Sequence, residues 1–548
     1  MTRMNTDKNF VAWLGSDPRL SVQSVVKKIV RLLFMGFASL TVVHAADFAF
    51  AEATIDSLQA RMAAGTLTAH ELTAAYLARI AEIDRAGPKL NAVIELNPDA
   101  LAIADALDAE RKAGHVRGPL HGIPILIKDN IATADRMETT AGSLALVGAK
   151  PPQDAALVTR LRAAGAVILG KTNLSEWAGF RSRAGITGWS GRGGQTRNPY
   201  VLYRNPWGSS AGSAVAVAAN LCVAAVGTET DGSIMGPAGH AAIVAVKPTV
   251  GLVSRTGVIP LSASQDTPGP MARTVRDAAI LLAVLAGPDA RDAATQALPP
   301  GELPALAAAL PAGALRGARI GVLRNSSSLR PTTAPVLEAA LAVLRAAGAE
   351  LVDPLLAPTI NDLDAPEAVV WQYEFKAGLN AYLATLGPGA PVKSLADVIA
   401  FNEAHRAQEM PLFGQDTLVQ AQARGPLTEP AYLDALAACR RLARTEGLDA
   451  LLAKHRLDAI VAVTNGPAGF LDVVNGNTWT GGSAGLAAVA GYPNVTVPAA
   501  QVAGLPVGIS FFGAPWTEAR LLGFAADFEA RTQARRPPTY RTAAELLK

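Results

Sequence analysis

The sequence predicts an α/β protein in which a large sheet is covered by helices on both faces. Several short apolar runs are continuous rather than alternating, which is typical of strands buried on both faces. Segments with helical spacing alternate with these runs along the chain. The chain has 548 residues, of which 50% are hydrophobic and 17% charged, so the side chains for a large core are available.

The N-terminal half of the chain supplies the first elements of this pattern. The apolar run 123–127 predicts a buried strand with Lys128 at or near its C-terminal end. Residues 156–164 have helical spacing, Gly165 ends that helix, and residues 166–169 predict a second buried strand. A strand over 223–227 follows, and so each predicted strand lies close to a predicted helix.

The C-terminal half continues the alternation. Leu337, Ala340, Leu341 and Leu344 lie at positions i, i+3, i+4 and i+7 of one helical face. Buried strands are predicted at 319–323, 350–352, 459–463, 494–497 and 508–512. The last of them follows a Gly-Leu-Pro turn, which suggests a hairpin with its predecessor.

The first 45 residues read as an export signal. Lys27, Lys28 and Arg31 precede the apolar run 32–43, and a small-x-small pattern then predicts cleavage after Ala45. The run is shorter than the ~20 residues that a membrane-spanning helix needs. We therefore expect a periplasmic or secreted protein in which residues 46–548 form a single domain, with an uncleaved, anchoring leader as the alternative.

Composition argues against several classes of function. The net charge of +3 and the aromatic content of 5% do not suggest a nucleic-acid partner. The seven histidines are scattered without metal-ligand spacing, and Gly170-Lys171-Thr172 lacks the glycine that a phosphate loop requires. No metal or organic cofactor is expected. Cys222 lies in an Ala/Val-rich run and is expected to be a small core residue rather than half of a disulfide with Cys439.

Lys128 has two interpretations. Its ammonium group could reach solvent from the end of the strand while its stem stays buried. Alternatively, the lysine is desolvated, in which case burial favours the neutral amine and makes it a base near pH 7. Sites in open α/β sheets lie at the C-terminal ends of strands, where Lys128 is placed.

Two serine-rich segments could hold a nucleophile. In 228–234 (TETDGSI), Ser233 ends a glycine turn whose backbone N–H groups could stabilise an oxyanion, although an ordinary turn explains the same pattern. In 208–213 (GSSAGS), Ser210 matches the G-x-S-x-G pattern of serine hydrolases. That pattern needs a strand just before the serine, and Asn205-Pro206-Trp207 resists one, so a helix N-terminus with small residues is favoured.

Taken together, these segments resemble the amidase signature family. Residues 122–130 resemble its lysine strand, residues 207–237 its glycine- and serine-rich signature, and residues 247–249 and 264–274 also match. Ser209 and Ser233 are 24 residues apart, as that signature expects. The similarity runs from about Ile55 to Pro538 and implies a mixed, mostly parallel twisted sheet between helical layers.

The resemblance also implies catalytic roles. Ser233 would be the nucleophile, Ser209 a bridging serine that follows a cis peptide bond, and Lys128 the base. The backbone N–H groups of Thr230, Asp231, Gly232 and Ser233 would form the oxyanion hole, and Ser210 would be a supporting hydrogen-bonding group. The implied reaction is the hydrolysis of a carboxamide through an acyl-enzyme, with release of ammonia.

Within the family, the chain is most similar to bacterial peptide amidases, which remove the C-terminal amide of peptides. Met235 stands where many members carry Arg, which disfavours a small anionic amide because Met cannot pair with a carboxylate. Trp207 and His240 depart from the family pattern; His240 could line the pocket or be structural. We expect a monomer that acts on a peptide or small-molecule amide. The alternatives are a general aliphatic or aryl amidase and an inactive binding protein on the same scaffold.

Overall fold

The computed structural model describes residues 48–543, apart from 302–305 and 307–309, and its centre is one eleven-stranded sheet. The order of the strands across the sheet is β1-β3-β2-β6-β8-β7-β12-β13-β11-β9-β10. Their bounds are β1 Val93–Leu96, β2 Pro124–Lys128, β3 Val167–Thr172, β6 Ala224–Glu229, β7 Val244–Lys247, β8 Thr267–Ala272, β9 Arg319–Leu323, β10 Glu350–Leu355, β11 Ala459–Val463, β12 Asn494–Val502 and β13 Leu505–Phe512. β4 (Trp189–Ser190) and β5 (Gly194–Gln195) form a separate two-stranded sheet.

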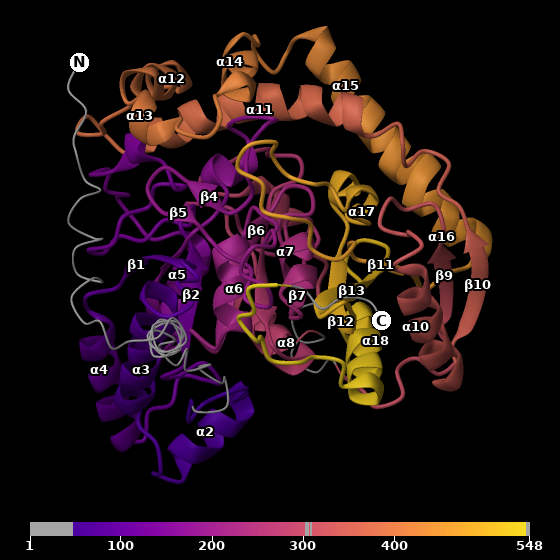
Figure 1. The fold of residues 1–548 in the computed structure, drawn as a ribbon, viewed down its shortest axis with the longest axis horizontal. Coiled ribbons are helices and arrows are strands. Elements are labelled where there is room, and N and C mark those ends of the chain that lie inside the picture. Colours follow the sequence, from indigo (N-terminus) through magenta and orange to yellow (C-terminus); the bar gives the residue numbers. More distant parts are fainter. Residues whose placement is uncertain (1–47, 302–305, 307–309, 544–548) are drawn as a thin grey trace, which may run out of the picture. The chain divides into compact units, whose positions relative to one another are not determined.

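Helices surround the sheet (Figure 1). In the N-terminal half they are α2 Ile55–Ala63, α3 Ala69–Arg79, α4 Ala100–Lys112, α5 Ala156–Ala163, α6 Ala211–Ala218, α7 Met235–His240 and α8 Val275–Leu285. In the C-terminal half they are α10 Ala334–Ala346, α11 Asp364–Thr385, α12 Leu395–Ala404, α13 Arg406–Glu409, α14 Asp416–Gln422, α15 Pro430–Arg440, α16 Asp449–His455, α17 Gly485–Ala490 and α18 Glu518–Thr532. Helices α11 to α15 form an arch along the top of the view in Figure 1.

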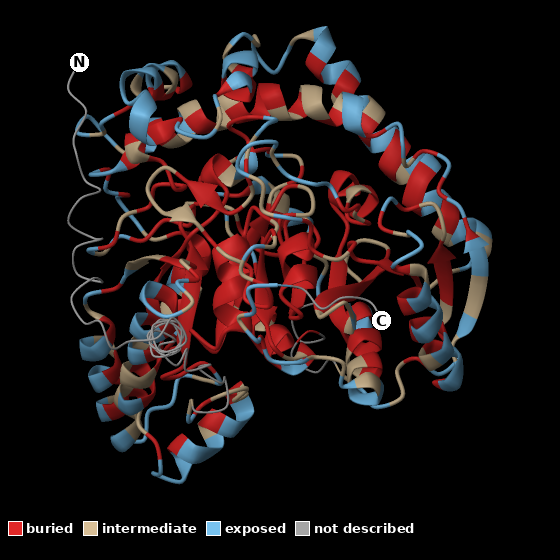
Figure 2. Ribbon diagram, in the orientation of Figure 1, coloured by how far each residue is buried: buried red, intermediate tan, exposed pale blue. Residues whose placement is uncertain are grey.

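Local sequence explains where many of these elements lie. Helix α3 begins after Thr68, whose side chain accepts a hydrogen bond from the N–H of Glu71 while the Glu71 carboxylate accepts one from Thr68 N–H, a reciprocal cap. Strands β9 and β11 have the bounds that their apolar runs predict, and all of β11 is buried. Figure 2 shows the same division: the central strands are buried and the outer helices alternate buried and exposed residues.

The α/β class predicted from the sequence is confirmed. The sheet was expected to be mostly parallel, but most of its strand pairings are antiparallel. Among the described pairings of the large sheet, four are parallel (β2·β3, β2·β6, β9·β10 and β9·β11) and six are antiparallel. The β12–β13 hairpin is one reason: Ala503 and Gly504 between the two strands both have positive φ, and so short a turn joins only antiparallel neighbours. The hairpin itself was expected.

Two further expectations concern the chain outside the site. Cys222 and Cys439 are both buried and free, and Cys222 lies in the core as its surroundings suggest. The predicted leader and its cleavage point after Ala45 lie outside the described residues. Within the described part of the chain, no helix has the length and apolar character needed to span a membrane.

Candidate active site

The candidate site lies at one edge of the sheet, where two parallel strands end together. β2 and β6 are neighbours, with Ile127 opposite Val226, so their carboxyl ends meet at the same edge. Lys128 ends β2 and Glu229 ends β6. Helix α6 begins at this edge, just after Ser209 and Ser210.

Small residues let α6 approach the sheet closely enough to place these serines. All eight residues of α6 are buried. A Cβ added at Gly212 would lie 2.3 Å from the carbonyl oxygen of Ala92 and 2.4 Å from that of Asn173. Only glycine allows this approach, and the Gly212 N–H donates a hydrogen bond to the Asn173 carbonyl.

Lys128 is a desolvated lysine rather than one that reaches solvent, since its side chain is fully buried. Its Nζ lies 2.7 Å from Ser209 Oγ, 3.0 Å from Ser210 Oγ and 2.9 Å from Thr228 Oγ1. Burial lowers the pKa of Lys128 to about 7, against the opposing effect of the negative charges of Asp266 and Glu229. A large fraction of this amine is therefore neutral near pH 7 and can accept a proton.

The two adjacent serines differ in what they can do. The Gly208–Ser209 peptide bond is cis, and Ser209 Oγ faces the amine of Lys128. Ser210 is fully buried; its Oγ donates to the Thr228 carbonyl and accepts from the Thr228 N–H. The segment before Ser210 does not form the strand that the G-x-S-x-G pattern needs, so that pattern is coincidental here.

Ser233 lies next to this pair. The Ser210 N–H donates a hydrogen bond of 3.1 Å to the Ser233 carbonyl oxygen. Ser233 is 9% exposed, compared with 3% for Ser209, so it is the more accessible of the two. The structure thus brings Lys128 and Ser209 into direct contact and places Ser233 beside them through the backbone.

The turn before Ser233 presents free donors. Gly232 has a φ of +71°, a conformation that favours glycine. The backbone N–H groups of residues 230–233 make no hydrogen bond to another described residue. Such groups can bind the oxygen of a carbonyl that becomes negatively charged.

Glu229 shapes this turn. It is 1% exposed, and its Oε2 accepts hydrogen bonds from the N–H groups of Ile234 (2.6 Å) and Met235 (2.9 Å). The chain must fold back toward the end of β6 to make these two bonds. Glu229 is therefore a positioning residue for the turn, a role that its sequence position did not reveal.

A second residue that the sequence did not single out joins the turn to helix α11. Gln265 Nε2 lies 2.7 Å from Glu367 Oε1 and 3.4 Å from the Thr230 carbonyl, and Gln265 Oε1 accepts from Trp371 Nε1. Residues 265 and 367 are 102 positions apart, so no local pattern could have indicated the contact.

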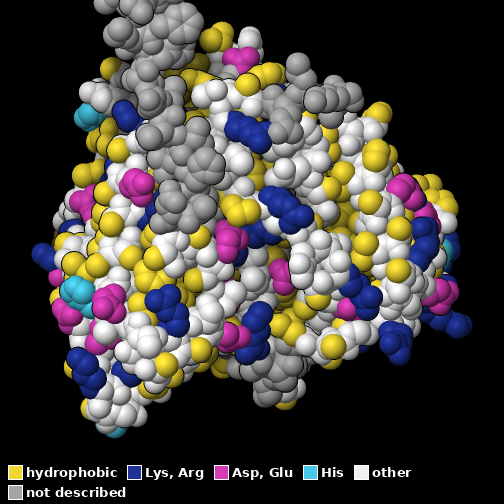
Figure 3. Space-filling model, turned by 60° about the horizontal axis from the view of Figure 1, so that its bottom comes forward, with side chains coloured by type: hydrophobic (Ala, Val, Ile, Leu, Met, Phe, Trp, Pro, Cys, Tyr) yellow, Lys and Arg dark blue, Asp and Glu magenta, His cyan; other side chains and the backbone are white. Residues whose placement is uncertain are grey.

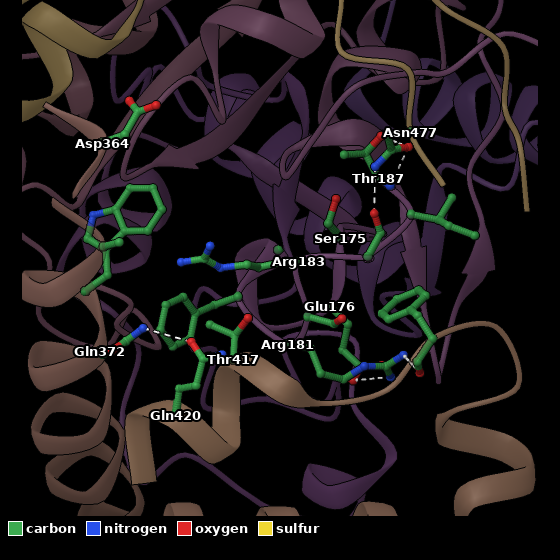
Figure 4. A pocket seen from close by; sticks show the side chains of 18 of the residues that line it. Ser175, Glu176, Arg181, Arg183, Thr187, Asp364, Gln372, Thr417, Gln420 and Asn477 are labelled. Carbon is green, nitrogen blue, oxygen red and sulfur yellow. Dashed lines mark hydrogen bonds and ion pairs between the residues drawn. The ribbon is translucent and has the colours of Figure 1, made fainter. Parts of the chain in front are cut away.

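Two adjoining cavities lie near the turn, and one of them is lined by residues of the turn itself. The inner cavity, about 540 Å³, is lined by Asp231 and Gly232 of the turn and by residues of α11. The outer cavity, about 920 Å³, extends from α11 to Ser175 and Thr187 (Figure 4). Asp364, Ala368 and Trp371 line both cavities, so the two adjoin along one face of α11. Ser175 also links the outer cavity to the serines, since its N–H donates to the Ser209 carbonyl.

His240 is structural rather than part of a cavity wall. It is 1% exposed, and its Nδ1 and Nε2 face the carbonyl oxygens of Asn205 and Gly466. Burial lowers its pKa to about 4, so it is neutral at physiological pH. Among the described residues, no cluster of three or more His, Cys, Asp or Glu side chains could hold a metal ion.

Known proteins share this architecture. The family model described as "Amidase" matches residues 71–522. A protein of Arabidopsis thaliana named "Probable amidase" is 41% identical over 505 residues, covering 90% of this chain and 92% of its own. The crystal structure of native peptide amidase from Stenotrophomonas maltophilia is similar with a TM-score of 0.86 and 54% identity, over 90% of this chain and 99% of that one. An amidase family protein from Bacillus anthracis is similar at 35% identity and a TM-score of 0.80, over 94% of this chain and 97% of that one. The chain therefore belongs to the amidase family and has the amidase signature fold. It is a hydrolase that acts on amides.

Proposed function

We propose that the protein hydrolyses the C-terminal carboxamides of peptides with Ser233 as nucleophile, Ser209 as proton relay and Lys128 as base. The observation that carries the proposal is the fully buried amine of Lys128, with a pKa of about 7, located 2.7 Å from Ser209 Oγ. A lysine in that state accepts a proton at neutral pH.

The first half of the reaction forms an acyl-enzyme. Ser233 Oγ attacks the carboxamide carbon while its proton passes to Ser209, whose own proton passes to the neutral amine of Lys128. The tetrahedral intermediate then collapses. The carbon–nitrogen bond breaks, the relay returns a proton to the nitrogen, and ammonia departs.

The second half releases the acid. Water attacks the Ser233 ester as the same relay takes up its proton. The bond between the acyl carbon and Ser233 Oγ breaks, Oγ regains a proton, and the peptide leaves with a free carboxyl group. In both halves, the N–H groups of Thr230, Asp231, Gly232 and Ser233 stabilise the negative oxygen; losing one such donor typically costs roughly 3–4 kcal/mol of transition-state stabilisation.

The size of the cavities favours a peptide over a small amide. The inner cavity of about 540 Å³ adjoins the turn, and the outer cavity of about 920 Å³ continues beyond it. Acetamide or benzamide would leave most of this space empty, whereas several residues of a peptide would occupy it. The name of the Stenotrophomonas maltophilia relative, peptide amidase, supports the same substrate class.

Ammonia release from an amidated dipeptide tests the proposal. The wild-type protein is expected to release one ammonia per peptide, and Ser233→Ala is expected to release none while keeping its unfolding temperature. A Ser213→Ala variant is the matched control, because Ser213 is another buried serine of the signature, and it contacts Thr172 and the Val226 carbonyl rather than the glycine turn. Full activity of Ser233→Ala would overturn the assignment of the nucleophile.

Two alternatives have their own outcomes in the same assay. A general amidase would release ammonia from benzamide faster than from the amidated dipeptide. An inactive binding protein would release none from either, and an acyl-serine reagent would fail to label Ser233.

We further propose that the protein is exported, acts as a monomer and has no nucleic-acid partner. On the face shown in Figure 3, positive and negative side chains are interspersed, which does not favour binding to a phosphate backbone. N-terminal sequencing of protein from the periplasm or medium tests the predicted cleavage after Ala45. The molar mass of the purified protein, measured by light scattering, tests whether it is a monomer.

A further inference from the structure

The inner cavity has an unusual charge balance. Asp231, Asp364 and Glu367 line it, and none of its described lining residues is Lys, Arg or His. Burial, together with the neighbouring charges of Glu229 and Asp364, raises the pKa of Asp231 to about 7. Burial and the charge of Asp231 raise the pKa of Glu367 well above its usual range. Asp231 and Glu367 therefore lack a countercharge strong enough to keep both fully ionised at neutral pH.

Glu367 has hydrogen-bonding capacity to spare. Its side chain is 5% exposed and lines the cavity from α11. Oε1 accepts a hydrogen bond from Gln265, whereas Oε2 accepts none from a described residue. Glu367 Oε2 can therefore accept a hydrogen bond from a group bound in the cavity.

Aromatic rings complete the cavity. Trp207 and Trp479 both line the cavity, and their rings are in contact with centroids 4.9 Å apart and planes tilted by 45°. Trp371 lines it from α11, seven residues after Asp364 and four after Glu367, on the same helical face. Tryptophan faces attract cations, and the attraction grows when water is excluded.

We propose that the inner cavity binds a cationic group carried by the acyl part of the substrate, a guanidinium or an ammonium close to the carboxamide that is cleaved. This inference rests on the proposed function and names its substrate class. A guanidinium can lie flat against a tryptophan while its N–H groups donate to carboxylates. The cavity adjoins Asp231 and Gly232 of the turn, so the cation would be held next to the reacting carbonyl. An acidic group at the same place would find no cationic partner among the residues that line the cavity.

The test compares two substrates of nearly the same shape. Acetyl-arginine amide carries a guanidinium, and acetyl-citrulline amide carries a neutral ureido group instead. The wild-type kcat/KM is expected to favour the arginine amide by about tenfold or more. Unacetylated citrulline amide adds an α-ammonium, so a gain over its acetylated form would identify the α-ammonium as a second source of the cation.

Charge-neutral variants identify the carboxylates responsible. Asp364→Asn and Glu367→Gln are expected to reduce the preference for arginine over citrulline to about threefold or less, mainly through KM. Asp362→Asn is the matched control: Asp362 is an exposed acid two residues before Asp364 that lines neither cavity. A loss of discrimination in Asp362→Asn equal to that in Asp364→Asn would overturn the assignment to this cavity.

Calorimetric binding to Ser233→Ala separates this inference from the proposed function. If that variant binds acetyl-arginine amide more tightly than acetyl-citrulline amide but the wild type releases no ammonia, the preference of the cavity for a cation stands and the proposed function fails. If the wild type hydrolyses both amides equally well, the inference fails and the proposed function stands. Absence of both binding and hydrolysis overturns both.

Discussion

Lowering the pH should inactivate the protein through Lys128. Its pKa is about 7 in the folded protein because the side chain is fully buried. Only the neutral amine can accept the proton of Ser209, so activity should be lost as the pH falls through 7 and should be constant well above it. Activity falls at low pH because protonation of Lys128 below its pKa leaves no neutral amine to act as the base.

The size of the effect follows from the titration. With a pKa of about 7, about nine-tenths of the amine is neutral at pH 8, half at pH 7 and about one-hundredth at pH 5. The value of kcat/KM should therefore fall tenfold for each pH unit below about 6 and be about 90-fold lower at pH 5 than at pH 8. Ammonia release from a neutral, acetylated dipeptide amide measures this profile.

Two variants show whether Lys128 is the group that titrates. Asp231 also has a pKa of about 7 and lies in the turn. Asp231→Asn should therefore change the maximal kcat/KM but not the pH at which kcat/KM falls to half of its maximum. Asp266 is the charge that most raises the pKa of Lys128, so Asp266→Asn should move the inflection to lower pH. A flat profile between pH 5 and 8, or an inflection that vanishes in Asp231→Asn, would refute the assignment of Lys128 as the base.

Three other substitutions have defined outcomes. Ser209→Ala should lower kcat/KM roughly 10²–10⁴-fold, because the proton relay to the amine is cut. Glu229→Gln should lower kcat about tenfold with little change in KM, since the turn 230–233 loses a charged acceptor that fixes its donors. Gly236→Ala should raise KM for peptide amides, because its Cβ would lie 2.1 Å from Trp207 Nε1 and would force that ring to move.

Each of these outcomes has a control. For Gly236→Ala the control is Gly485→Ala, which adds a methyl group to the same cavity at an ordinary distance of 3.5 Å from Asp231 Oδ2 and should leave KM nearly unchanged. Thermal unfolding should show folded protein for Ser209→Ala and Glu229→Gln. An unchanged kcat in Glu229→Gln would contradict the role given to that side chain.

Local pattern was enough to locate most elements of the fold. The bounds of β9 and β11 agree with their apolar runs, because every residue of the two strands except the half-buried Arg319 lies in the core. Whether neighbouring strands run parallel or antiparallel was harder to predict from the sequence. β7 and β12 are antiparallel neighbours although nearly 250 residues separate them, and no local signal specifies such a pairing.

The candidate site shows the same division. Lys128 could be recognised because a lysine at the end of an apolar run is unusual, and the two serines because they match the family signature. Glu367 and Trp371 could not be recognised, since their role depends on α11 lying against the turn and on Gln265 connecting the two. Their sequence surroundings are those of an ordinary helix.

By itself the sequence determined the fold class, the positions of the main strands and helices, and the three residues proposed to act on the amide. Periodicity and a spaced signature encode these features locally, in the chemistry of neighbouring residues. Only the tertiary structure decided that Lys128 is desolvated, that the turn donors are free, and that three carboxylates and three tryptophans enclose one cavity. Burial and charge balance arise from residues that are 81 or more positions apart in the chain, such as Lys128 and Ser209, so they exist only once the chain has folded.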